Sequence, residues 1–172
     1  MVPTHPARSC QMNTWKTAVA ASSLLLLMPL VHAAPPSFEQ YPAKRYQGKN
    51  AAVKLNADTR SFRTRFRDLS HEKANFAGHY AVGYAGCGTG CVLGMMVDVK
   101  NGATQFIGSV SDCPPKEGFE KWRDKEIAFR PNSRLLVITG IINEDDNEHP
   151  VCSKQYWLEQ NGKLKRIHTE VL

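Results

Sequence analysis

This sequence has no apolar run long enough to cross a lipid bilayer. Its longest, Ala18–Leu30, contains 13 residues, whereas a membrane-spanning helix needs about 20. The sequence also lacks the Gly-Lys-Ser/Thr ending of a P-loop, the Cys-x2-Cys spacing of thiol oxidoreductases and histidines at zinc-ligand spacing. These absences argue against a transmembrane protein, a P-loop nucleotidase and a thioredoxin-like enzyme. We expect no cofactor and no metal.

The N-terminal 33 residues have the pattern of a signal peptide. Lys16 supplies positive charge before the apolar run, and the Val-His-Ala of residues 31–33 fits a cleavage site with small residues at its two selective positions. We therefore expect residues 1–33 to be removed, so that the mature chain begins at Ala34. We expect Met12 to be the true start, because it gives a signal peptide of more usual length than Met1 does. The sequence predicts a periplasmic or secreted protein with no membrane anchor after cleavage.

The charge balance is mildly basic. The chain has 22 Lys and Arg, 16 Asp and Glu, and a net charge of +6. Removal of residues 1–33 takes Arg8 and Lys16 and no acid, which lowers the net charge to +4 over 139 residues. That length suffices for one domain with a core. We interpret the excess as an ordinary solvated surface and expect no nucleic-acid partner.

The cysteines support an oxidising compartment. Four of the five lie in the mature chain, and an even number in an exported protein predicts two disulfides with three pairings open. We favour Cys87–Cys91, because the Gly88-Thr89-Gly90 turn lets the backbone fold back without steric cost. The second bond is then Cys113–Cys152. Closing its loop of about 40 residues stabilises by about 4 kcal/mol in the chain-entropy model.

One helix is predicted near the start of the mature chain. Phe62, Phe66 and Leu69 recur at i, i+4 and i+7, which is one face of a helix. Asp58 or Thr59 is the expected N-cap. Four arginines occupy the other side, which we interpret as a solvated face: Arg60, Arg63, Arg65 and Arg67.

The rest of the chain has the pattern of β-structure. A nearly continuous apolar run, Leu135–Ile142, predicts a central strand buried on both faces. Asn101-Gly102 and Asn161-Gly162 are two-residue hairpin signals of the type I′ turn. The other expected strands are residues 52–55 at an edge, 79–85, 92–100, 103–107, 127–129, 156–158 and 164–171.

The two halves of this β-region share one rhythm, a long apolar strand followed by an Asn-Gly turn and a return strand. Two such units cannot close a propeller. We therefore expect an α+β fold with one N-terminal helix packed on a twisted antiparallel sheet of about six to eight strands, or on two packed sheets, in two meander or blade-like units. Residues 34–50, with three prolines, are expected to be an extended leader, and residues 51–172 a single domain.

The segment Asn75–Leu93 has the composition of a site. It contains five glycines, two cysteines and a histidine beside a tyrosine. The Cys-x3-Cys spacing favours a structural disulfide over a redox site, because strands and a glycine turn surround it. Backbone N–H groups of the turn could hold an anion. The candidate binding residues of this segment are His79, Tyr84, Gly88, Thr89 and Gly90.

The motifs of this segment resemble those of a known family. Asn75-Phe76-Ala77-Gly78-x-Tyr80, then Gly86-Cys87-Gly88-x-x-Cys91, then Val97-Asp98 before Asn101-Gly102, are similar to motifs of small exported bacterial proteins of unknown function. The resemblance covers roughly residues 51–110. It implies a periplasmic setting, and it suggests no particular reaction.

Function is predicted as binding without catalysis. The sequence shows no convincing nucleophile or acid–base pair, so we expect an inhibitor-like module with a protein partner in the periplasm, its oligomeric state left open. The alternative is a small cell-envelope hydrolase that uses His79 with Asp98 or Asp112. Convergence of His79 with either acid in one concave pocket would favour that alternative. The acidic stretch 143–148 lacks the order of a calcium loop and is interpreted as solvated.

Overall fold

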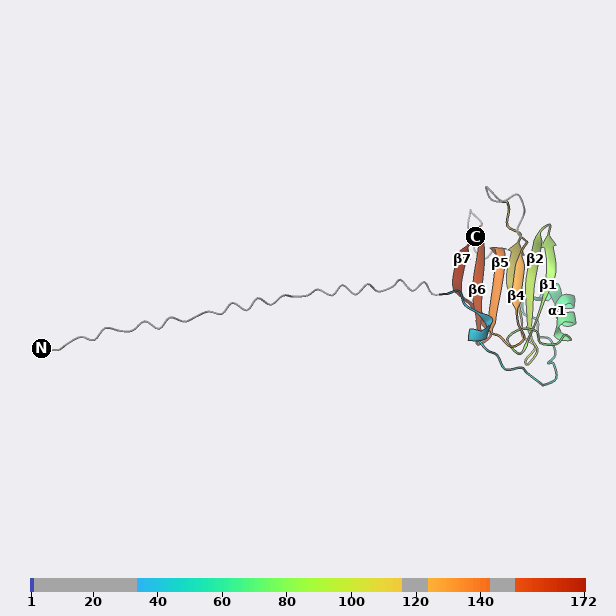
Figure 1. The fold of residues 1–172 in the computed structure, drawn as a ribbon. Coiled ribbons are helices and arrows are strands. Elements are labelled where there is room, and N and C mark those ends of the chain that lie inside the picture. Colours follow the sequence, from blue (N-terminus) through green and yellow to red (C-terminus); the bar gives the residue numbers. More distant parts are fainter. Residues whose placement is uncertain (2–33, 116–123, 143–150) are drawn as a thin grey trace. The chain divides into compact units, whose positions relative to one another are not determined.

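Seven antiparallel strands form one open sheet in the computed structural model, which describes Met1 and residues 34–115, 124–142 and 151–172. The sheet order is β1-β2-β3-β5-β6-β7, and β4 pairs with β5 (Figure 1). The predicted α+β fold, with a twisted antiparallel sheet and one α-helix, is confirmed. The strands are β1 (Tyr80–Gly88), β2 (Cys91–Asp98), β3 (Thr104–Ser111), β4 (Glu126–Phe129), β5 (Leu135–Ile142), β6 (Cys152–Gln160) and β7 (Lys163–Val171); the helices are η1 (Phe38–Gln40), η2 (Arg60–Phe62) and α1 (Arg63–Ser70).

The sheet consists of two meanders. The first is β1-β2-β3 and the second is β5-β6-β7 with β4 alongside. They join through two residue pairs between β3 and β5, Val110 with Ile142 and Ser111 with Ile141. Both meanders contribute to one shared core, and the Tyr84 hydroxyl of β1 donates to the carbonyl of Ile127 in β4 at 3.3 Å. The largest members of this core are Phe76, Tyr80, Met96, Leu136, Ile138 and Trp157.

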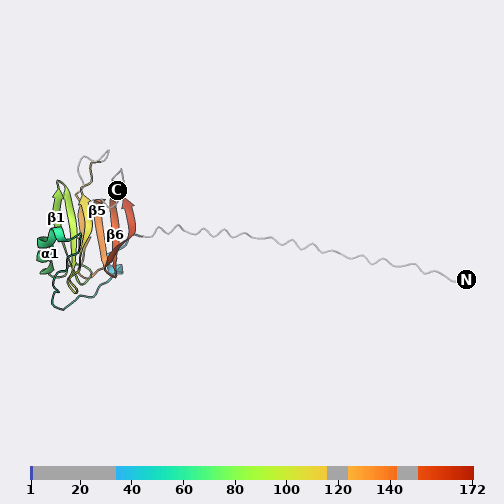
Figure 2. The ribbon, with the colours of Figure 1, turned by 180° about the vertical axis from the view of Figure 1, so that it is seen from behind.

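The central strand β5 is buried on both faces, as predicted. Leu136 and Ile138 point into the shared core. Leu135 and Val137 point the other way, where Phe38 of η1 and its neighbours cover them. Figures 1 and 2 show η1 beside the second meander and α1 beside the first. A continuous apolar run is what a strand with two covered faces requires.

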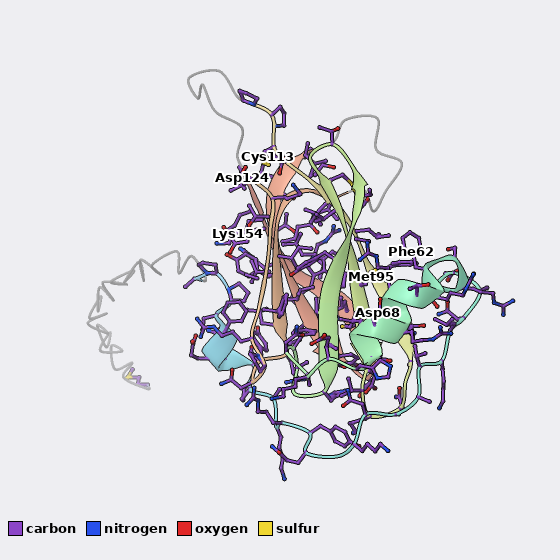
Figure 3. The ribbon with its side chains drawn as sticks, turned by 90° about the vertical axis from the view of Figure 1, so that its right-hand side faces the viewer. Phe62, Asp68, Met95, Cys113, Asp124 and Lys154 are labelled. Carbon is purple, nitrogen blue, oxygen red and sulfur yellow. A yellow bond between two sulfur atoms is a disulfide. The ribbon has the colours of Figure 1, made fainter. Side chains whose placement is uncertain are left out.

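Helix α1 covers the outer face of the first meander. Phe66 is fully buried and packs with Met95 and Val97 of β2 and edge-on against Phe106 of β3, with 5.3 Å between ring centroids. Figure 3 shows α1 beside the strand that carries Met95. The predicted apolar face is therefore the packed one. Of the two expected caps, Thr59 is the N-cap of η2, which leads into α1, but its side chain does not cap the helix. Instead, Asn56 Oδ1 accepts from the Thr59 N–H at 2.9 Å, and Thr59 Oγ1 accepts from the Asn56 N–H at 3.0 Å.

The two Asn-Gly pairs form different turns. Asn161 (φ 53°) and Gly162 (φ 82°) connect β6 to β7 in the predicted two-residue turn. Asn101-Gly102 instead belongs to a five-residue connection between β2 and β3, and within it only Gly102 has positive φ (82°). The carbonyl of Gly102 accepts from the N–H of Lys54 at 2.7 Å. The expected edge strand at 52–55 is reduced to this contact and one parallel bridge, Lys54 with Ala103.

Both favoured disulfides are present. Cys87–Cys91 joins the two sides of the β1–β2 hairpin with 5.2 Å between Cα atoms. Cys113–Cys152 joins the end of the first meander to the start of β6 with 5.5 Å between Cα atoms. Disulfides fit an extracytoplasmic protein. No helix in the described ranges is long and apolar enough to cross a membrane.

The edge strand β1 is covered at its start by the side chain of Asn75. The amide nitrogen of Asn75 donates to the carbonyl of Val82 at 2.9 Å, and its oxygen accepts from the Val82 N–H at 2.7 Å. Residues 34–50 also lie against the fold, since Ala43 and Tyr46 donate backbone hydrogen bonds to Asn132 and Gly78. The predicted signal peptide and the acidic stretch 143–148 lie outside the described residues.

Candidate functional site

A polar cleft of about 780 Å³ lies where the Asn-Gly turns of the two meanders meet. Beside these turns, the amide of Gln105 in β3 donates to the carbonyl of Gly162 at 3.1 Å and ties the two meanders together. Each meander therefore contributes one wall. The lining residues are His79, Tyr80, Asp98, Asn101, Arg134, Glu159, Gln160, Asn161 and Gly162.

A strained backbone turn places His79 in this cleft. Ala77 and Gly78 both have positive φ, 45° and 79°, which disfavours the alanine, since few residues other than glycine adopt this region. A Cβ on Gly78 would lie 2.1 Å from the carbonyl oxygen of Lys44, so the position demands glycine. The N–H groups of Ala77 and Gly78 donate to the carbonyls of Ser133 and Pro131 and hold the turn on the second meander.

The same turn determines which imidazole nitrogen of His79 carries the hydrogen. His79 Nδ1 lies 2.9 Å from the carbonyl oxygen of Ala77. A carbonyl oxygen can only accept, so Nδ1 carries the hydrogen and Nε2 is the nitrogen available to a ligand. Nε2 lies 3.8 Å from Asp98 Oδ2, and the His79 side chain is 23% exposed. The neutral ring presents an acceptor at Nε2, and the protonated ring pairs with Asp98.

Asp98 is oriented by the turn that follows it. Its Oδ1 accepts from the Lys100 N–H at 2.9 Å, and its carbonyl accepts from the Gly102 N–H at 2.7 Å. Its Oδ2 is the oxygen that faces His79. The carboxylate is therefore fixed before any ligand arrives, which reduces the ordering cost of binding.

Glu159 has the equivalent position in the second meander. Its Oε1 accepts from the Gly162 N–H at 2.9 Å and from the Tyr80 hydroxyl at 3.3 Å. Burial, together with the negative charges of Glu159 and Asp98, raises the pKa of Tyr80 well above its ordinary value. The Tyr80 hydroxyl therefore stays protonated and keeps its hydrogen bond to Glu159 in the cleft wall.

Arg134 brings a cation to the cleft between these carboxylates. Its Nη1 lies 3.5 Å from the carbonyl oxygen of Glu159, a weak contact, and its backbone N–H donates to Tyr41 at 2.8 Å. Within the described part of the chain, no carboxylate forms an ion pair with its guanidinium. Guanidinium groups bind carboxylates and phosphates through two parallel hydrogen bonds. Arg134 is therefore the natural contact for an anionic group.

The structure separates the two acids proposed as partners of His79. Asp98 converges with His79, but Asp112 lies at the opposite end of the first meander, beside the pair formed by Cys91 and Ser111. There it accepts from the backbone N–H and the ammonium group of Lys125, both at 2.9 Å. These bonds hold the pKa of Asp112 below its ordinary value. Asp112 cannot act on a ligand held by His79.

The candidate binding residues do not form one site. His79 precedes β1, whereas Gly88, Thr89 and Gly90 follow or end it at the disulfide tip, so about 25 Å of strand separates them. Thr89 is exposed, as expected. Tyr84 lies between, 45% exposed, and burial of part of its ring raises its pKa to about 12.

Seven of the nine residues that line the cleft were not among the candidates named from the sequence: Tyr80, Asn101, Arg134, Glu159, Gln160, Asn161 and Gly162. The repeated rhythm contained a usable signal. Each Asn-Gly pair follows a carboxylate by two or three residues, Asp98 in one unit and Glu159 in the other. Packing the two units side by side in the same orientation brings these carboxylates to one end. Arg134 has no comparable signal, because it precedes an apolar strand without any motif.

The described residues contain no group of three or more His, Cys, Asp or Glu side chains placed to hold a metal ion. Fold and site together define a small α+β protein with one open antiparallel sheet and a polar cleft between two meanders. Comparison with known proteins finds no matching family model, no matching curated protein and no matching solved structure.

Proposed function

We propose that this chain is an exported, periplasmic binding module that recognises a small polar ligand carrying an anionic group. The observation that supports the proposal is the position of Arg134, a cation free of carboxylate partners among the described residues, in a cleft lined by oriented hydrogen-bonding groups. Arg134 would bind the anionic group. His79 Nε2, Asp98 and the Tyr80 hydroxyl would bind the polar groups of the ligand.

The cleft suits recognition because its polar groups are already held in place. Asp98 and Glu159 each close a turn with one set of bonds and face the cleft with the remainder. Fixed partners give specificity, since a ligand that lacks the matching group leaves a buried polar atom unpaired. The cleft is comparable in volume to small-molecule sites.

A hydrolase that uses His79 is the second candidate, and one observation favours it. Nε2 of His79 faces Asp98 in a concave site, and Nδ1 is anchored on the Ala77 carbonyl. A neutral imidazole held in this way can take a proton from water at Nε2. In this alternative His79 is the general base, and Asp98 stabilises the imidazolium that forms.

A protein partner is a third element of the proposal, and its site is the Cys87–Cys91 tip. Gly86 and Gly88 have no atom within 4 Å of an added Cβ, and Thr89 is exposed between them and Gly90. The tip is thus an open projection of the β1–β2 hairpin. Its role is independent of the cleft, because the two lie at opposite ends of β1.

Ligand binding is tested by thermal unfolding with a panel of small anions: amino acids, dicarboxylates, sugar phosphates and uronic acids. A ligand at 100 times its Kd stabilises by about 2.7 kcal/mol, which raises the Tm by several degrees. Arg134→Gln should abolish the rise, whereas Thr89→Arg, at the far end of β1, should retain it. A panel without effect, or a rise unchanged in Arg134→Gln, would contradict the proposal.

Analysis of the ligand after incubation distinguishes the hydrolase alternative from binding alone. Mass spectrometry of the ligand after incubation should show it unchanged if the chain only binds. Cleavage that is lost in His79→Gln, with the Tm rise retained, would establish the second candidate.

A further inference from the structure

The positive charge of this protein is concentrated in one segment. Residues 44–73 contain nine Lys and Arg and three Asp and Glu, a net charge of +6. The whole chain also has a net charge of +6, so the other 142 residues are balanced, with 13 basic and 13 acidic residues. A charge asymmetry of this size indicates an anionic partner. The net charge of the whole chain does not reveal this concentration.

None of the nine cations is neutralised within the described fold. All nine are exposed, and no ion pair among the described residues includes any of them. By contrast, Lys125 and Arg130, outside this segment, both pair with carboxylates. The nine are Lys44, Arg45, Lys49, Lys54, Arg60, Arg63, Arg65, Arg67 and Lys73.

Packing brings several of these cations onto one surface. Arg45 and Lys73 line one shallow hollow, and Lys49, Arg67 and Lys73 line the next, which has a volume of about 860 Å³. The amide of Asn50 lies in both and donates to the carbonyls of Ser70 and Glu72 at 2.8 and 2.9 Å, which ties the 45–53 segment to the end of α1.

Arg63 extends this surface along α1, because it precedes Arg67 by four residues and so lies on the same side of the helix. We call Arg45, Lys49, Arg63, Arg67 and Lys73 the basic surface. Glu72 is the carboxylate that also lines it. Asp68 lies on the other flank of α1 with Arg65, beside Gly83 and Tyr84. Figure 3 shows α1 on the outside of the first meander, and Arg63 and Arg67 on this helix are both exposed.

We propose that the basic surface docks on the phosphate head groups of an anionic phospholipid bilayer. Basic residues near an anionic bilayer each contribute about fivefold to affinity. The basic surface includes none of the exposed large apolar side chains, which among the described residues are Met1, Tyr84, Val151 and Val171. Protein interfaces are built around such apolar or aromatic anchors, whereas a charged lipid surface needs only flexible cations. Association is thus peripheral, without insertion.

The proposal is tested by sedimentation of the purified protein with vesicles. Vesicles of equal parts phosphatidylglycerol and phosphatidylcholine should bind the protein, and vesicles of phosphatidylcholine alone should not. Binding should weaken steeply between about 0.05 M and about 0.2 M salt, because exposed charges are screened over that range. Arg63→Gln with Arg67→Gln should weaken binding roughly thirty-fold, since two cations are lost.

The matched control is Lys163→Gln with Lys165→Gln, which removes two exposed cations from β7. It should change vesicle binding less than about twofold. If the helix pair lowers the Tm, Lys49→Gln with Lys73→Gln replaces it. Equal losses in both pairs, binding to phosphatidylcholine alone, or binding to soluble polyphosphate, DNA or an acidic polypeptide without binding to anionic vesicles would overturn the proposal.

Discussion

The two meanders share a sequence rhythm but differ in what covers their Asn-Gly turns. In the second meander nothing lies closer than 4.0 Å to a Cβ placed on Gly162, so Asn161-Gly162 adopts the two-residue turn that its local preference favours. In the first meander a Cβ on Gly102 would lie 1.9 Å from the carbonyl oxygen of Ala52. The chain segment before α1 therefore packs closely against that turn.

The difference shows that a local turn signal predicts the turn type only where no other segment contacts the turn. Asn-Gly predicts a type I′ turn because both residues tolerate positive φ. At Asn101-Gly102 the carbonyl of Gly102 is bound by Lys54, and Asp98 accepts from both Lys100 and Gly102, which selects a wider turn. Tertiary contacts decide between turns of similar local energy.

The largest effect is expected from cutting the covalent link between the meanders. Replacing Cys113 and Cys152 by alanine should lower the free energy of unfolding by about 4 kcal/mol, because the closed loop is long. Urea denaturation followed by circular dichroism measures this. Replacing Cys87 and Cys91, which bridge a four-residue separation, should cost about 2 kcal/mol in the same model. An equal or reversed order would contradict the chain-entropy reasoning.

Gly102→Ala should destabilise by about 3 kcal/mol. The added methyl group meets the Ala52 carbonyl, and positive φ is itself costly for alanine. Urea unfolding measures the loss, and the cleft should also weaken, because this turn orients Asp98. A cost below about 1 kcal/mol would show that the Ala52–Lys54 segment moves readily to accommodate the added methyl group.

Gly162→Ala is the matched change in the other meander and should cost about 1 kcal/mol. Its φ is also 82° but its surroundings are open, so only the backbone cost of the left-handed region applies. The difference between the two glycine variants isolates the steric contribution of the Ala52 contact. Equal costs would refute the assignment of the wider turn to tertiary contact.

Thr89→Arg should have the smallest effect on stability, within about 0.5 kcal/mol, because the side chain is exposed at the disulfide tip. The same variant tests the partner role of the tip, since a bulky cation there should abolish capture of a protein partner from a periplasmic extract. Capture of the same partner by both wild type and variant would show that the partner binds elsewhere than at the tip.

Patterns with one dominant cause were predictable from the sequence. The covered faces of α1 and β5 follow from burial of Phe66 and Leu136, and the disulfides follow from glycine at the tip and the cysteine count. Of the nine residues that line the cleft, only His79 and Asp98 were predicted, as one of two alternative pairs. Arg134 and Glu159 were missed, because their roles depend on how the two meanders pack, which no local pattern encodes.

Asn75 occupies part of the hydrogen-bonding edge of β1 near its start. A primary amide carries the same donor and acceptor as a peptide group, so its two bonds to Val82 replace those of a neighbouring strand. Exposed strand edges otherwise recruit other chains into edge-to-edge aggregates. Further along, the register shift between Gly86 and Gly88 interrupts the regular spacing that an added strand would need. The side of the sheet that carries the open hairpin is thereby protected from uncontrolled self-association.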